Sequence, residues 1–189
     1  GMFDQAWKPF ILERADRPDA DALIARVLTY FCVAAAGAFL AVAFFVEAAA
    51  KAPVFLGSPL FHPAYWDGLV IVPIVTLGYL FNGLYFVMLA PLMLDRRTGA
   101  VGAATWTGAA VNVAANLLLI PRFGMEGAAW ATCGAYAAMA AAVWALGRVT
   151  RAVPYEWRRL AALTAWTSVL WLAGARAGLA LRAVLLAAY

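Results

Sequence analysis

Charged side chains are scarce in this sequence. Of its 189 residues, 13% are Asp, Glu, Lys or Arg and 66% are hydrophobic, and the mean hydropathy is +0.83. A water-soluble domain of this size needs more polar surface to cover its core, so the composition excludes an ordinary soluble domain. In a soluble protein, the net charge of +4 would be compatible with binding to nucleic acid. In so apolar a chain it is explained by membrane topology, and no nucleic-acid partner is expected.

Residues for metal and redox chemistry are almost lacking. The sequence has one His, His62, and two Cys, Cys32 and Cys133. Both Cys lie in apolar runs, which predicts packing residues rather than a disulfide, and a lone His does not predict a metal site. We find no nucleophile with a base, no Gly-rich phosphate loop and no pair of catalytic carboxylates. The sequence therefore predicts neither an enzyme nor a bound cofactor.

Long runs without charge are what the sequence has instead. Roughly 20 residues at 1.5 Å rise span a bilayer core of ~30 Å; four runs reach this length and a fifth barely does. No water satisfies the backbone inside a bilayer and period-two alternation is absent, so the runs predict helices rather than a barrel. The predicted fold class is all-α, a polytopic transmembrane helical bundle. Its predicted transmembrane helices cover residues 27–46, 69–94, 100–120, 125–147 and 157–173.

The chain divides into three segments on this basis. Residues 1–26 are predicted to hold the end of a truncated transmembrane helix and a cytoplasmic link, and residues 27–147 hold four transmembrane helices. Residues 148–189 are predicted to hold a cytoplasmic link, one further transmembrane helix and a truncated last helix. The final apolar run, 177–189, is about half the length needed to span a bilayer. We therefore interpret the sequence as part of a larger membrane protein.

Lys and Arg alternate between the predicted loops. Ten of the fourteen lie in residues 1–26, 95–98 and 148–159. Because cytoplasmic loops carry an excess of Lys and Arg, these three segments are predicted to be cytoplasmic. The turn at residues 121–125 then lies on the outer side.

A tight turn is predicted within the stretch NLLLIPRFGMEGAAWAT. Pro121 is expected to end one helix, because it has no N–H donor and its ring clashes with the preceding turn. Gly124 permits the chain to reverse, and small residues from Gly127 onward predict close packing of the next helix. Arg122 and Glu126 are four residues apart and are expected to pair at the membrane surface. A direct role of these two charges with a substrate is the alternative.

Polar residues recur at helical spacing in two of the predicted helices. Their spacing of three, four or seven residues puts each set on one helix face. An amide in hydrocarbon is costly unless it is hydrogen-bonded, so such a face meets another helix or a wet cavity. For the amides of the helix 100–120, interhelical bonding and the lining of a saccharide cavity are both open. For the helix 69–94, ordinary packing and saccharide recognition are both open. The residues are Thr105, Asn112 and Asn116 in the helix 100–120, and Thr76, Tyr79 and Asn82 in the helix 69–94.

The stretch NVAANLLLIPRFGMEGAAWATCGAY resembles the signature of the polysaccharide flippases of the multidrug/oligosaccharidyl-lipid/polysaccharide exporter superfamily. Four further stretches resemble the same family in the same order: FDQAWKPF, RVLTYF, IVPIVTLGYLFNGLYFV and VPYEWRRL. The resemblance covers essentially the whole chain, but only the C-terminal part of a family member. It implies a fold of two pseudosymmetric six-helix lobes around a central cavity, of which this chain would hold most of the second lobe and the accessory helices.

The resemblance also implies a function. A family member flips polyprenyl-linked oligosaccharide repeat units across the bacterial cytoplasmic membrane by alternating access, with an ion gradient as the energy source. The expected partners are the lipid-linked glycan, membrane lipids and the missing N-terminal lobe. Other classes remain open: a membrane-embedded glycan polymerase or glycosyltransferase, a non-transporting assembly scaffold, and a related exporter of drugs or peptidoglycan precursors.

The predicted topology can be tested by single-Cys labelling of an otherwise Cys-free protein. A Cys at Ser58 or Phe123 should react with an impermeant maleimide in intact cells. A Cys at Arg97 should react only after the cells are permeabilised, because positive-inside loops stay in the cytoplasm. If the Cys at Ser58 needs permeabilisation, the orientation is wrong.

Overall fold

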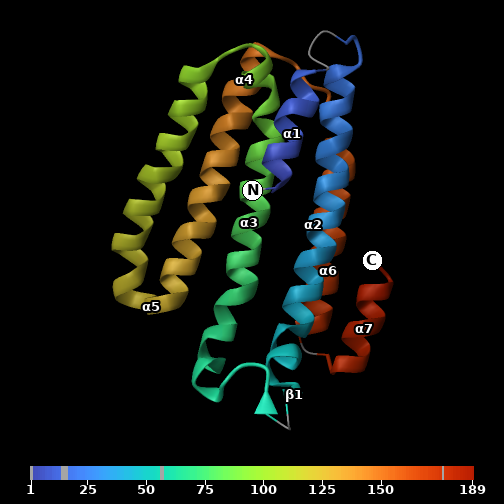
Figure 1. Ribbon diagram of the computed structural model, residues 1–189, viewed down its shortest axis with the longest axis vertical. Coiled ribbons are helices and arrows are strands. Elements are labelled where there is room, and N and C mark those ends of the chain that lie inside the picture. The colour runs from blue at the N-terminus through green and yellow to red at the C-terminus, as the bar shows by residue number, and fades with distance from the viewer. Residues whose placement is uncertain (1, 14–16, 56–57, 176) are drawn as a thin grey trace.

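The computed structural model describes residues 2–13, 17–55, 58–175 and 177–189, and these residues are almost entirely helical (Figure 1). This confirms the all-α prediction. Among the described residues, three helical stretches are long and apolar enough to cross a membrane. They are Ala20–Lys51, Pro63–Leu94 and Thr98–Thr150.

Long helices carry the fold, and short elements lie at their ends. The long helices are α2 (Ala20–Lys51), α3 (Ile71–Met88), α5 (Thr98–Thr150) and α6 (Trp157–Ala175). The short elements are α1 (Met2–Leu12), the antiparallel strands β1 (Pro53–Phe55) and β2 (Ser58–Pro59), the 3-10 helix η1 (Pro63–Val70), α4 (Ala90–Leu94) and α7 (Leu179–Ala187).

All five predicted spans differ in their bounds from the helices of the structure, and two of them differ most. The helix expected at 27–46 is longer at both ends, because it includes charged residues such as Asp21 and Lys51 that lie beyond the charge-free run. The helix expected at 69–94 is preceded by the 3-10 helix η1 and is interrupted at Leu89. Pro91 follows this interruption; it has no N–H to donate to the preceding turn, so the ladder of backbone hydrogen bonds is broken there.

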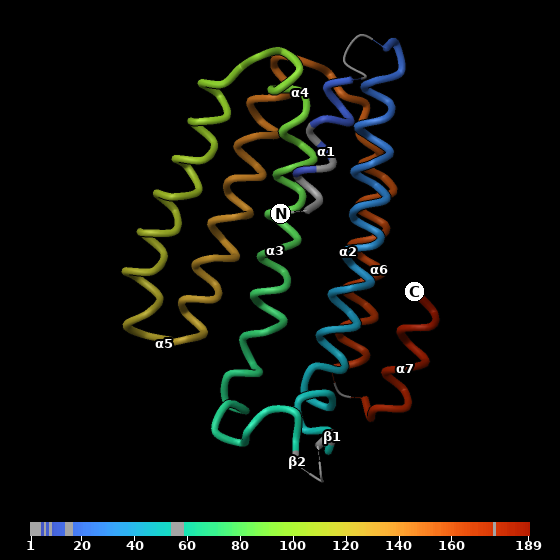
Figure 2. The backbone as a smooth tube through the Cα atoms, in the orientation of Figure 1, coloured from blue at the N-terminus to red at the C-terminus, as the bar shows by residue number. Residues whose placement is uncertain are grey.

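Helix α5 is a hairpin whose two arms, residues 98–123 and 125–150, reverse direction at Gly124 (Figure 2). Gly124 has φ 53° and ψ −126°, a backbone conformation that residues with a Cβ rarely adopt. The sequence pattern predicts that the first arm ends at Pro121. In the structure the arm continues through Phe123 instead. A proline in the last turn removes only one backbone hydrogen bond, which leaves glycine to decide where the chain turns.

Close contacts at glycines hold α3 and the two arms of α5 together. A Cβ on Gly127 would lie 2.4 Å from the carbonyl oxygen of Leu119, so the two arms touch backbone to backbone just after the turn. Further along, Gly108 of the first arm faces Met139 of the second. Gly78 of α3 faces Cys133 of the second arm. The second arm therefore lies between the first arm and α3, as Figure 1 shows.

The rest of the bundle is built around α2. Helix α2 packs against α3, α6 and α7. One buried cluster includes Trp7, Leu28, Leu92 and Val143, so it joins α1, α2, α4 and the second arm of α5. A second cluster of Leu40, Phe44 and Leu170 joins α2 to α6, and residues of α7 pack against it.

The three basic segments of the sequence meet at one end of the molecule. The start of α2, the link after α4 and the link between α5 and α6 all lie at the end opposite the turn of α5 (Figure 1). There the Arg151 guanidinium donates from Nε to Asp21 and lies 3.9 Å from the Asp95 carboxylate. The Thr29 hydroxyl donates to Glu156 over 2.7 Å. The alternation of Lys and Arg along the sequence predicts that these basic segments lie together at one end. Which side of a membrane this end faces stays a prediction.

Contact between the arms of α5 predicts different effects for two glycines of the second arm. Gly127→Ala should lower thermal stability and membrane yield, because its Cβ overlaps the backbone of Leu119. Overpacking of this kind costs about 1–3 kcal/mol, and Gly127→Leu should be worse.

Gly134→Ala is the matched control, because a Cβ at Gly134 meets nothing within 4 Å. It should leave melting temperature and yield near wild type, as should Leu118→Ala, since Leu118 is 61% exposed. Equal melting temperatures for Gly127→Leu and the wild type would show that the two arms do not pack as described.

Candidate functional site

The polar stripe of the first arm of α5 faces α3. The Thr105 Oγ1 lies 3.3 Å from the phenol oxygen of Tyr85, a buried residue of α3. The Thr105 hydroxyl already donates to the carbonyl of Val101 over 3.0 Å, so Tyr85 is the donor in this contact. Asn112 and Asn116 share the helix face of Thr105. They therefore lie on the side of the arm that is turned toward α3.

A second contact brings the polar stripe of α3 to the same side. The rings of Tyr79 on α3 and Tyr136 on the second arm of α5 have centroids 6.0 Å apart. Asn82 lies three residues beyond Tyr79, on the same face of α3. Tyr136 is one turn from Cys133, which contacts Gly78 of α3, and one turn from Met139, which contacts the first arm. It therefore lies between the two neighbouring helices.

Tyr79 and Asn112 also lie at nearly the same height in the bundle, and Asn82 and Asn116 are each about one helical turn from them. Helix α3 and the first arm of α5 run in opposite directions (Figure 1). Tyr79 is six residues before Tyr85, and Asn112 is seven residues after Thr105. At 1.5 Å per residue they lie about 9 Å and about 10.5 Å from the Tyr85–Thr105 contact, toward the same end. Phenol and amide groups from three helical segments thus gather on one side of the bundle.

The two amides of the first arm bond to each other rather than to another helix. The Asn116 Nδ2 donates to the backbone carbonyl of Asn112 over 2.9 Å and to its Oδ1 over 3.0 Å. Within the described part of the chain no hydrogen bond reaches the Asn112 Nδ2 or the Asn116 Oδ1. Both residues are half-buried. Each amide therefore keeps a group free for a ligand, and the interhelical alternative has no contact to support it.

The other predicted residues of these stripes have separate environments. The Thr76 hydroxyl donates to the carbonyl of Val72, one turn back in its own helix, over 2.8 Å. The Thr105 hydroxyl is hydrogen-bonded to the Tyr85 phenol. Asn82 is half-buried, whereas Tyr79 is 61% exposed. We call Tyr79, Asn82, Asn112, Asn116 and Tyr136 the polar face.

The polar face carries hydrogen-bonding groups without charge. Phenols and amides both donate and accept, and flat aromatic rings offer an apolar surface beside them. This combination suits a neutral ligand with many hydroxyl groups. In the described ranges no group of three or more His, Cys, Asp or Glu side chains is placed to hold a metal ion.

The turn residues lie away from the polar face, at the end of the bundle. Arg122 and Glu126 are both exposed, and no ion pair or hydrogen bond joins them in the described structure. The expected pairing is therefore not formed: the two residues lie on different arms, on either side of the reversal at Gly124. Glu126 is in the first turn of the second arm, where a carboxylate is favoured by the helix dipole.

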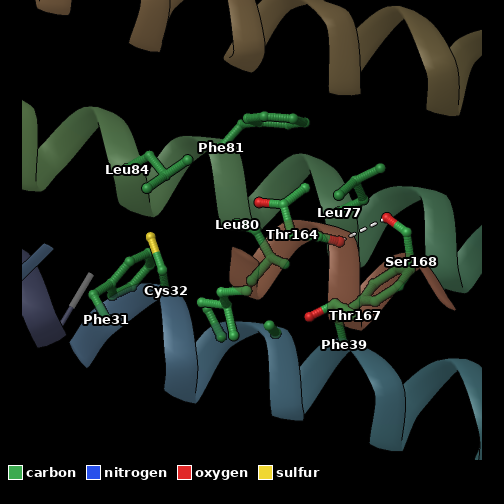
Figure 3. A pocket seen from close by; sticks show the side chains of 13 residues that line it. Phe31, Cys32, Phe39, Leu77, Leu80, Phe81, Leu84, Thr164, Thr167 and Ser168 are labelled. Atoms are coloured by element: carbon green, nitrogen blue, oxygen red, sulfur yellow. Dashed lines mark hydrogen bonds between the residues drawn. The ribbon is translucent and has the colours of Figure 1, made fainter. Parts of the chain in front are cut away.

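A cavity of different character lies on the other side of α3. It has a volume of about 210 Å³ and lies between α2, α3 and α6 (Figure 3). Its walls are apolar apart from the Cys32 thiol and the hydroxyls of Thr164, Thr167 and Ser168 on α6. Ser168 donates to the Thr164 carbonyl over 2.8 Å, while the buried Thr167 hydroxyl finds no hydrogen-bond partner among the described residues. This lining suits hydrocarbon rather than a sugar.

Sequence reasoning missed residues on both sides of α3. Tyr136 lies in a stretch of Ala and Gly, and only its contact with Tyr79 marks it. The hydroxyls of α6 are at positions 164, 167 and 168, a helical spacing that could have been recognised. The pairing of Arg151 with Asp21, 130 residues earlier, has no local signal.

Comparisons with known proteins do not extend this description. No family model, no curated protein and no solved structure matches the chain.

Proposed function

We propose that this chain is part of a polytopic membrane transporter that moves a lipid-linked oligosaccharide across the bacterial cytoplasmic membrane. The observation that carries the proposal is the polar face. Its amides and phenols come from α3 and from both arms of α5, and they follow each other along one side of these segments. Asn112 and Asn116 keep unused hydrogen-bonding groups there. Such groups are costly in hydrocarbon unless a polar ligand, water or a partner segment meets them.

The chemistry of the polar face favours transport over synthesis. Transfer of a glycosyl unit needs groups that move protons, commonly carboxylates or His. All five residues of the polar face are uncharged amides or phenols. They can bind and release hydroxyl groups, which is what carriage of a glycan requires.

The proposed mechanism is alternating access. A second lobe would cover the polar face, and the two lobes would rock so that the cavity between them opens to one side of the membrane and then the other. The glycan would exchange its hydrogen bonds with water for bonds with the polar face, while its lipid tail stays in the bilayer. The close glycine contacts of α3 and α5 make these helices suited to moving as one body.

Replacement of the polar-face amides tests the proposal. The double variant Asn112→Ala/Asn116→Ala should reduce glycan export at least severalfold, measured as surface polysaccharide per molecule of protein. Melting temperature and membrane level should stay near wild type, because hydrogen bonds within membrane proteins average about 0.6 kcal/mol. Asn82→Ala should act in the same direction.

Thr107→Ala is the matched control on the same arm. Thr107 is exposed, its hydroxyl donates to Ala103 in its own helix, and it lies off the polar stripe. Export should be unchanged in this variant. If export in the Asn variants falls only in proportion to the amount of protein in the membrane, the amides are structural and the proposal is refuted.

A further inference from the structure

A pocket at the basic end of the bundle is separate from the polar face and from the apolar cavity. It has a volume of about 250 Å³ and lies where α5 ends and the link to α6 begins. Its lining combines two cations, three aromatic rings and an apolar side chain of α3. These are Arg148, Arg151, Trp144, Tyr155, Trp157 and Met88.

The two arginines of this pocket differ in what they bind. Arg151 is three-quarters buried and pairs with Asp21 and Asp95, so its charge is balanced within the protein. Arg148 is exposed and lies over the ring of Trp144, with its guanidinium carbon 4.8 Å from the ring centroid. No carboxylate pairs with Arg148 among the described residues. The stacking orients its guanidinium but leaves the N–H donors available.

The aromatic rings form a connected wall beside Arg148. Trp157 packs edge to face against Trp144 at 5.6 Å and against Tyr155 at 5.5 Å. Burial, with a smaller contribution from the Asp21 charge, raises the pKa of Tyr155 to about 12. Its phenol is therefore protonated at neutral pH and adds no negative charge to the pocket. Helix α6 begins at Trp157, so the positive end of its dipole also lies beside the pocket.

The pocket lies where lipid head groups would meet the bundle if its apolar helices cross a membrane. It lies at the ends of the apolar helices α3 and α5, where Trp side chains commonly meet the membrane interface. Met88 extends the lining toward the apolar layer. Basic pockets between membrane helices on the cytoplasmic side are suited to anionic head groups, since a guanidinium binds phosphate through several N–H donors.

We propose that this pocket binds the phosphodiester head group of an anionic membrane lipid, with Arg148 as its principal ligand and the Trp144–Trp157 wall against the glycerol part. The lipid would join the end of α5 to the start of α6. The proposal needs only that this end of the bundle faces an anionic leaflet, and it is independent of what the polar face carries.

Native mass spectrometry of the intact protein in detergent tests this site, with phosphatidylglycerol and phosphatidylcholine as probes. Phosphatidylglycerol should bind at least about tenfold more tightly than phosphatidylcholine. Arg148→Gln should remove most of this preference, and Arg148→Lys should keep part of it, because a single charge remains without the planar guanidinium. Arg122→Gln is the matched control, since Arg122 is an exposed arginine at the opposite end of the bundle.

The results separate the proposal from its rivals. Equal binding of the two lipids, or equal losses in Arg148→Gln and Arg122→Gln, would overturn it and indicate general attraction to positive charge. Displacement of phosphatidylglycerol by millimolar inorganic phosphate would also overturn it, since the site would then bind free phosphate. Reduced export in the Asn112→Ala/Asn116→Ala variant with unchanged lipid binding would support two independent sites.

Discussion

The close approach of helix backbones at glycine is the constraint on which this structure depends. Gly127 brings the two arms of α5 together at Leu119, and Gly78 brings α3 onto the second arm. In an apolar environment large side chains gain little by leaving lipid for protein, so association relies on contacts that only small residues permit. These contacts set the spacing of three helical segments. The position of every residue on the polar face follows from that spacing.

Helix α3 separates two chemically different regions. Its residues Tyr79 and Asn82 lie on the side of α5, with phenols and amides around them, whereas Leu77 and Leu84 line the apolar cavity toward α2 and α6. One helix can line both regions because residues three or four apart lie on the same face, and the residues between them lie on other faces. Such a division would let a ligand with a polar head and an apolar tail meet different surfaces of the same bundle.

The ion pair of Arg151 with Asp21 and Asp95 lies at the ends of helices and connects them. Arg151, at the end of α5, pairs with Asp21 in the first turn of α2 and with Asp95 just after α4. Glu156, just before α6, accepts a hydrogen bond from Thr29 of α2. These ion pairs are partly exposed, so water screens them. They fix the positions of the links between helices rather than adding much to the stability of the fold. Arg148 pairs with no carboxylate in the described structure, so its guanidinium is available to a ligand from outside the protein.

The sequence alone determined the all-α class, the approximate helices and the grouping of basic links at one end, because these follow from hydropathy, helical period and local charge. It also showed that Thr105, Asn112 and Asn116 share a face, since this needs only their spacing. Tertiary structure decided the rest. The first arm of α5 continues past Pro121 to Phe123, and the chain reverses only at Gly124, whose backbone angles favour a residue without Cβ. That Tyr136 meets Tyr79, and that Arg151 meets Asp21, depends on which helices pack together, and no local pattern records contacts between residues so far apart in the chain.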